Sequence, residues 1–352
     1  MLYVVFALVF VLGAAIGSFL NVCAYRLPFE KSILWPGSRC GSCFQPVRWY
    51  DNIPLLSYWL LRGRCRDCGA SFSARYFWIE LATGLGFVGL FYLEVCRNVL
   101  NLPYIRQAEA DIVEGLVPLH VWVVFFYHAL LLGFLITASL CDLEHMEIPL
   151  SLTVTGTVVG LVGSMVFAWP FPSDPPAPVV DPQTRMLFEG LYAWPVWDQL
   201  PAWMPQGSWQ LGLATGLAGA AMGMLILRGI RFLFGLGRGL EGMGVGDADL
   251  MMMAGAFVGW QPILIAFFAA IVPGLILGIL QLLIRGNQAM PFGPSLAFGV
   301  MLTLLTWPVV GRHFKILFIH ADALAIIAGM GCVLLLVLSF ILRLTRGRPK
   351  SE

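Results

Sequence analysis

Long apolar runs separated by polar segments are the main pattern of this chain. An α-helix needs about 20 apolar residues to cross the hydrocarbon core of a bilayer. Runs of about that length cover residues 2–22, 76–96, 119–141, 150–169, 210–234, 262–284, 293–310 and 321–343. A shorter run covers 248–258. The pattern therefore predicts an all-α polytopic membrane protein with about eight to nine transmembrane helices.

Composition supports a membrane protein and argues against a nucleic-acid partner. Hydrophobic residues make up 59% of the 352 residues and charged residues only 12%, about half the charged share of a typical soluble domain. The net charge is +1, and basic residues are not interleaved with aromatic ones outside the first polar segment. We therefore expect membrane lipid, and no nucleic acid, among the partners.

The basic residues are distributed unevenly between the polar segments. Sixteen of the 21 Lys and Arg residues fall in 23–75, in 228–238, at Arg285 and in 343–350. By the positive-inside rule, these segments are expected in the cytoplasm. The N-terminus would then lie outside, which requires an odd number of crossings and favours nine. Because no basic stretch precedes the first apolar run, we expect an uncleaved helix there and not a signal peptide.

Four cysteines in the first polar segment have the spacing of a metal site. Cys40 and Cys43 form one CxxC pair, Cys65 and Cys68 form another, and 21 residues separate the pairs. Two such pairs supply the four thiolates of a tetrahedral zinc site, with Gly41 and Gly69 at the turns. Four protein ligands leave no open position, so the expected zinc is structural. Structural or redox disulfides are the alternative, although they are rare in the cytoplasm.

Two aspartates at the edges of apolar runs are candidates for chemistry. Asp142 ends one run and Asp247 opens another, and both fall on the predicted cytoplasmic side. Ionisable residues at membrane spans are costly and often functional. Asp142 could also be an ordinary charged helix end, and Asp247 could be only a helix N-cap. The glycines before Asp247, Gly244 and Gly246, are more than a cap needs.

A pair of aspartates brought together could catalyse hydrolysis. Two close carboxylates share a proton, because both cannot ionise cheaply. One can then activate a water molecule while the protonated one polarises a peptide carbonyl. The sequence alone does not bring positions 142 and 247 together.

The chain resembles a known family, the type IV prepilin peptidases (leader peptidases and N-methyltransferases), which are GxGD membrane aspartyl proteases. The motifs occur in order: GSFLNVCAYRLP (17–28), SRCGSC (38–43), WYDNIPLLSYWLLRGRCRDCG (49–69), RYFWIELATG (75–84), Asp142 with Ile148-Pro149, GMGVGD (242–247) and PFGPSLA (291–297). Together they extend over most of residues 10–310.

The resemblance implies a reaction and a catalytic pair. Such enzymes cut the basic leader from type IV prepilins and from type II secretion pseudopilins at the cytoplasmic face of the bacterial inner membrane. Asp142 and Asp247 match their catalytic aspartates. Many members also N-methylate the new N-terminus with S-adenosylmethionine, and the four-cysteine loop is typical of these. The methyl-transfer region would lie within 38–84, where no nucleotide fingerprint helps to find it.

With this family in view, the chain divides into four predicted parts. These are a first transmembrane helix (1–22), a cytoplasmic zinc-binding loop domain (23–75), a membrane peptidase core (76–310) and a C-terminal extension with a further helix (311–352). Within the core, the Pro- and Trp-rich stretch 170–209 is predicted to be an external insertion, because its prolines forbid regular helix. The glycine-rich stretch 212–223 is expected to allow close helix packing.

The chain departs from the family beside the second aspartate. A lysine usually stands two residues after the GxGD motif, whereas this chain has Asp249. A third carboxylate there is expected to shift the pH optimum and not to change the reaction. The acidic residues near the pair could attract a basic leader or could be ordinary solvated charges; they are Glu144, Glu147, Glu241 and Asp249.

Three other functions remain open at the level of sequence. The first is a membrane methyltransferase or assembly factor with an inactive protease site. The second is a scaffold or transporter, although most runs carry no acid at their centres. The third is a relative of signal-peptide peptidases, which share the GxGD aspartate but lack the four-cysteine loop.

Overall fold

The computed structural model describes residues 1–167, 191, 194, 200–205, 207–239, 244–285 and 290–346. The chain forms two compact units, Met1–Leu152 and Thr153–Glu352. The described residues are helical, apart from loops and two isolated β-bridges. The fold class predicted from the apolar runs is therefore confirmed. The proposed insertion, 170–209, lies largely outside the described residues.

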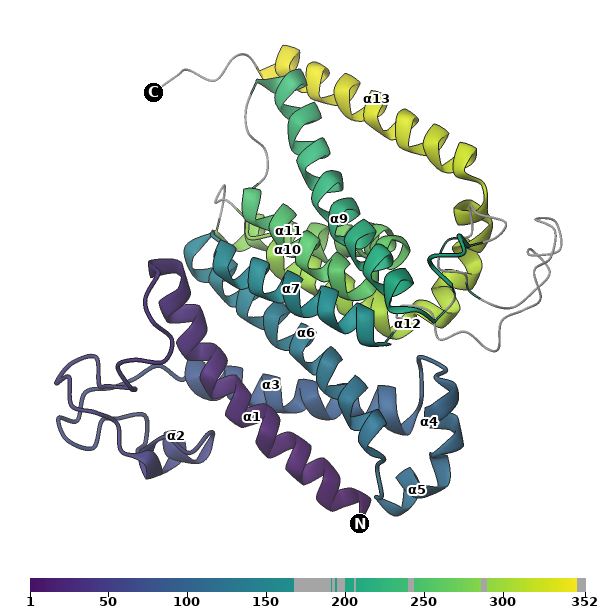
Figure 1. Cartoon of the computed structure of the whole chain (residues 1–352). Coiled ribbons are helices and arrows are strands. Elements are labelled where there is room, and N and C mark those ends of the chain that lie inside the picture. Colours follow the sequence, from purple (N-terminus) through teal and green to yellow (C-terminus); the bar gives the residue numbers. More distant parts are fainter. Residues whose placement is uncertain are drawn as a thin grey trace. The chain divides into compact units, whose positions relative to one another are not determined.

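Three long helices form the frame of the first unit (Figure 1): α1 (Leu2–Arg26), α3 (Arg75–Phe91) and α6 (Leu119–His145). Helices α1 and α3 approach closely because glycines stand where they meet. A side chain at Gly13 or Gly17 of α1 would overlap α3, and one at Gly84 of α3 would overlap Phe10. Small residues of this kind drive helix association within membranes.

A buried contact between a glutamate and a histidine joins the far end of α3 to α6. Helix α3 ends in a π-helical turn, η3 (Tyr92–Cys96), followed by the short helices α4 (Pro103–Gln107) and α5 (Glu109–Glu114). Glu94 of η3 lies 2.7 Å from Nδ1 of His128 on α6, and both side chains are at most 2% exposed. Buried ionisable groups within apolar units are stable only when they have such partners.

The described residues of the second unit include α7 (Leu150–Phe167), which begins at the unit boundary, and five further helices. These are α9 (Trp209–Arg238), α10 (Val245–Val258), α11 (Trp260–Arg285), α12 (Gly293–Ile319) and α13 (Ala321–Arg346). Ser208 is the N-cap of α9, and its hydroxyl accepts a hydrogen bond from the Leu211 amide at 3.2 Å. The helix ends at Gly239, whose left-handed conformation (φ 74°) is typical of a helix end.

The glycines of 212–223 bring helices into backbone contact, as the sequence predicted. A methyl group on Gly219 of α9 would overlap the carbonyl oxygen of Gly255 on α10, and one on Gly255 would overlap that of Gly219. Gly223 meets Met251 of α10 in the same way, and Gly212 meets Ser164 of α7. The helix that carries Asp247 is therefore fixed by backbone-to-backbone packing.

Eight of the described helices are long and apolar enough to cross a membrane. They match the eight long runs of the sequence, and α13 is the further helix predicted for the C-terminal extension. The ninth, shorter run forms α10, whose 14 residues extend about 21 Å. That length is below the hydrocarbon thickness of about 30 Å. The nine-crossing topology stays a prediction.

Candidate metal centre and catalytic aspartates

The four cysteines of the first loop converge on one point. Their sulfur atoms all lie within 4.8 Å of one another, with 3.8 Å between Cys40 and Cys68 and 4.0 Å between Cys43 and Cys65. In a tetrahedral site with zinc–sulfur bonds of about 2.3 Å, the sulfurs lie about 3.8 Å apart. The cluster therefore has the geometry needed to hold a metal ion.

Two equivalent turns present the sulfurs. In each turn, the first cysteine donates its amide to the carbonyl five residues on, and its own carbonyl accepts from the amide four residues on. The residue at that fourth position has positive φ in both turns: Phe44 (58°) in the first and Gly69 (72°) in the second. Gly69 thus occupies a turn position that favours glycine, whereas Gly41 does not have positive φ.

The electrostatics of the cluster also favour a cation. Amides of Cys43 and Ser42 donate to the Cys40 sulfur and lower the pKa of this thiol to about 6. The pKa of the Cys43 thiol rises to about 12. The hydrogen bond from the Gln45 amide lowers this pKa, but partial desolvation and hydrogen bonds with the neighbouring thiols raise it by more. Ionising all four thiols together requires a positive charge between them, which a divalent metal supplies.

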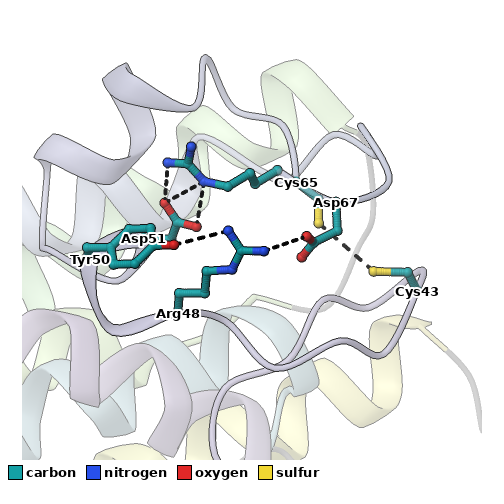
Figure 2. Close-up of polar contacts among 7 residues, drawn as sticks. Cys43, Arg48, Tyr50, Asp51, Cys65 and Asp67 are labelled. Atoms are coloured by element: carbon teal, nitrogen blue, oxygen red, sulfur yellow. Dashed lines mark hydrogen bonds and ion pairs between the residues drawn. The ribbon is translucent and has the colours of Figure 1, made fainter.

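Charged side chains brace the two turns against each other (Figure 2). Arg66 donates to both carboxylate oxygens of Asp51 at 2.6 to 3.1 Å. Arg48 links Tyr50 (3.0 Å) to Asp67 (3.2 Å). The Arg66 hydrogen bonds lower the pKa of Asp51. These contacts join Arg48, Tyr50 and Asp51 to Arg66 and Asp67, the two residues between the second pair of cysteines.

One hydrogen bond attaches this loop to α3. The amide of Leu55 donates at 2.7 Å to Oε2 of Glu80, a side chain buried in the second turn of α3. Leu55 has φ 64° and ψ −50°, and the Leu56 amide donates to the Pro54 carbonyl at 2.7 Å. This is a γ-turn with positive φ at its central residue, a rare and strained conformation. Glu80 therefore holds a strained turn directly on a membrane-spanning helix.

Asp142 lies in the last turn of α6 and is 6% exposed. Its carbonyl accepts the amide of Met146, whose left-handed conformation ends the helix. The neighbouring Glu144 forms an ion pair with Arg75 at the start of α3. Asp142 is thus a buried side chain on a fixed helix end, unlike a solvated terminal charge.

Asp247 lies in the first turn of α10 and is 8% exposed. The helix begins after Gly244, so Gly244 is the N-cap and Asp247 is the third helical residue. The interpretation of Asp247 as an N-cap is therefore wrong. A Cβ on Gly244 would lie 3.7 Å from a carboxylate oxygen of Asp247. Gly246 stands between them in the same turn.

The unusual Asp249 has a basic partner. Its carboxylate lies 3.1 Å from Arg228 of α9, and its side chain is only 10% exposed. Among the other acidic residues near the motifs, Glu147 is exposed and Glu241 lies outside the described residues. Since Arg228 offsets the charge of Asp249, the extra negative charge beside Asp247 is smaller than the sequence suggests. Asp142 belongs to the first unit and Asp247 to the second, so their pairing stays a prediction.

Two family models match the chain. The Bacterial Peptidase A24 N-terminal domain matches residues 11–93, which include the four cysteines. The Type IV leader peptidase family matches residues 129–279, which include both aspartates.

Curated relatives carry one recurrent name, "Prepilin leader peptidase/N-methyltransferase". The Myxococcus xanthus protein is 33% identical over 278 residues, which cover 79% of this chain and 63% of that protein. The Stutzerimonas stutzeri protein is 29% identical over 84% of this chain and 88% of its own length. The Pseudomonas aeruginosa protein is 28% identical over 86% of this chain and 91% of its own length. No solved structure matches the chain.

Proposed function

The chain belongs to the type IV leader peptidase family, and from this premise we propose that it is a prepilin leader peptidase with Asp142 and Asp247 as its catalytic pair. The observation that carries the proposal is the family match over 129–279, which contains both acidic motifs. In addition, both side chains are buried on ordered helix ends. Burial of a carboxylate is costly and is typical of a functional site in a membrane protein.

The proposed reaction is hydrolysis of the peptide bond after the leader. The ionised carboxylate takes a proton from water, and the water oxygen attacks the carbonyl carbon of the scissile bond. The protonated carboxyl donates a hydrogen bond to the carbonyl oxygen. When the carbon–nitrogen bond breaks, the leaving amine takes up a proton and becomes the new N-terminus.

The same enzyme is proposed to methylate that N-terminus with S-adenosylmethionine. The methyl group passes from the sulfonium of this donor to the free amine. Residues 38–84 are the proposed location of this activity. Within them, Glu80 and the strained turn at Leu55 join the loop to α3. Strained backbone of this kind is often found at functional sites.

The metal is proposed to be zinc with a structural role. All four ligands come from the protein, so no coordination position is left for a substrate. A loop of about 50 residues buries too little apolar surface to fold unaided. The metal would supply that missing stability.

The chain is a multi-pass protein of the inner membrane, and the proposed active site lies at its cytoplasmic face with the N-terminus outside. The excess of Lys and Arg in 23–75 supports this orientation. Type IV prepilins are the proposed substrates, together with type II secretion pseudopilins.

Cleavage assays on purified full-length protein test the catalytic pair. Asp142→Asn and Asp247→Asn should each abolish cleavage of a prepilin, while thermal stability and metal content stay at wild-type values. Asp322→Asn, an exposed aspartate at the start of α13, is the matched control and should cut normally. Wild-type cleavage by either test variant would remove that residue from the mechanism. Methylation of a pre-cut pilin by both variants would separate the two activities.

A further inference from the structure

The short helix α2 (Leu56–Leu60) presents an apolar face that no described residue covers. Leu56, Trp59 and Leu60 have the spacing of one helix face, and they are 57%, 69% and 72% exposed. A polar loop would normally place such side chains in a core. The face therefore needs an apolar or interfacial surrounding.

The opposite side of α2 is fixed to α3, so the exposed face has a defined position. The ring of Tyr58 packs 5.7 Å from Phe77 of α3 and 5.7 Å from Phe72. The Leu55 amide just before α2 is held by Glu80 of α3. A helix attached at both of these points cannot turn its exposed face inward without breaking them.

The exposed face continues onto the membrane-spanning helix itself. Trp59 lies 5.9 Å from Phe77, and Phe77 lies 5.3 Å from Trp78. Tyr76 and Trp78 are 44% and 62% exposed, in the first turn of a helix long and apolar enough to cross a membrane. Trp and Tyr at the end of a membrane span are typical of the headgroup region.

Basic residues follow the apolar face directly. Arg62 and Arg64 are exposed, and neither forms an ion pair with another residue that the structure describes. An apolar face with Trp and Leu beside basic side chains is characteristic of segments that lie in the interface of a bilayer with anionic lipids.

We propose that Leu56, Trp59, Leu60, Tyr76 and Trp78 form a lipid-facing patch that rests in the headgroup layer. The occupant is membrane lipid, because the patch is continuous with the exposed apolar surface of α3, a helix long and apolar enough to cross a membrane. The patch would hold the four-cysteine loop against the bilayer, so that the position of the loop is set by the membrane as well as by Glu80.

Fluorescence quenching by brominated lipid tests the proposal. The full-length, metal-loaded protein is placed in nanodiscs of phosphatidylcholine and phosphatidylglycerol, with acyl chains brominated near the headgroup or unbrominated. The quenched emission is compared between wild type, Trp59→Phe and Trp49→Phe. Trp49 is a still more exposed ring (81%) of the same loop, and its centroid lies 5.6 Å from that of Tyr50, outside the patch.

We expect Trp59→Phe to remove a component of the emission that brominated lipid quenches, and Trp49→Phe to remove a component that it does not quench. A double variant, Leu56→Ser with Leu60→Ser, keeps Trp59 and should lose most of the quenching at that ring. Prepilin cleavage and metal content verify that each variant is folded. Equal quenching in wild type and Trp59→Phe would overturn the proposal. The proposal would also be overturned if the emission of Trp59 were unaffected by brominated lipid but shifted when prepilin is added, because the patch would then bind protein.

Discussion

The four-cysteine loop and the α9–α10 pair keep their shapes by different kinds of contact. In the loop, side chains carry the structure: four sulfurs converge within 4.8 Å, and arginines bind carboxylates across the turns. Between α9 and α10, the backbones themselves touch, because Gly219 and Gly255 have no side chains to separate them. The loop depends on charged side chains and on a cysteine cluster that could hold a metal ion, whereas the helix pair depends on close backbone packing.

Asp247 is carried by α10, so its position depends on helix packing and not on the metal. The loop is attached to α3 through Glu80 and Leu55, and its integrity depends on the cluster. We therefore expect metal removal to disturb the loop and to leave the packing of α10 unchanged.

Metal removal should have the largest effect on the difference between the loop and the α9–α10 pair. Structural zinc contributes on the order of 10 kcal/mol to small zinc-bound folds, so a strong chelator should unfold the loop. The α9–α10 pair should keep its structure, because none of its contacts involves the cluster. Hydrogen exchange measured segment by segment should rise in residues 38–74 and stay low in 245–258. Equal loss of protection in both segments would show that the two regions are not independent.

A methyl group between α9 and α10 is the next largest perturbation. Gly219→Ala places a Cβ against the backbone of Gly255 and Gly259, and overpacking of this kind costs about 1–3 kcal/mol. Since α10 carries Asp247, prepilin cleavage should fall along with the thermal unfolding midpoint in detergent.

The same helix provides the control. A methyl group added at Gly229 would meet no atom within 4 Å, so Gly229→Ala should leave activity unchanged and gain up to about 1 kcal/mol from helix propensity. If both alanine variants behave alike, close backbone contact is not what fixes α10.

Much of this architecture could be predicted because its signals are local. Apolar length predicted the spanning helices: the run 119–141 became α6, Leu119–His145, and the run 321–343 became α13, Ala321–Arg346. The CxxC spacing predicted the convergence of the sulfurs. The glycine-rich stretch 212–223 predicted close packing, because small residues have few other uses on membrane helices.

The polar pairs could not be predicted, because their partners lie far apart in the sequence and follow no period. Glu94 meets His128 across 34 residues, and Arg228 meets Asp249 across 21. Only the packing of whole helices brings these side chains together. The γ-turn at Leu55 gave no signal either, since leucine seldom adopts positive φ and nothing in the neighbouring residues requires it.

The smallest perturbation concerns the ion pairs that brace the cysteine turns. Asp51→Asn removes the carboxylate that accepts three hydrogen bonds from Arg66, and Asp67→Asn removes the single contact to Arg48. Asp51 is 7% exposed and Asp67 is 39% exposed, and a more exposed pair contributes less to stability. Loss of metal to a chelator should therefore be faster in Asp51→Asn than in Asp67→Asn, and slowest in the wild type.

The pH dependence of that difference follows from the direction of the pKa shift. Arg66 lowers the pKa of Asp51 below the usual aspartate value of 3.8. A carboxylate with a lowered pKa stabilises the fold at every pH above its usual value, and this stabilisation disappears only as the pH falls through the lowered value. The difference between wild type and Asp51→Asn should therefore stay constant across neutral pH. A difference that shrank between mildly acidic and neutral pH would mean that another group, such as a cysteine ligand, controls the bracing of the loop.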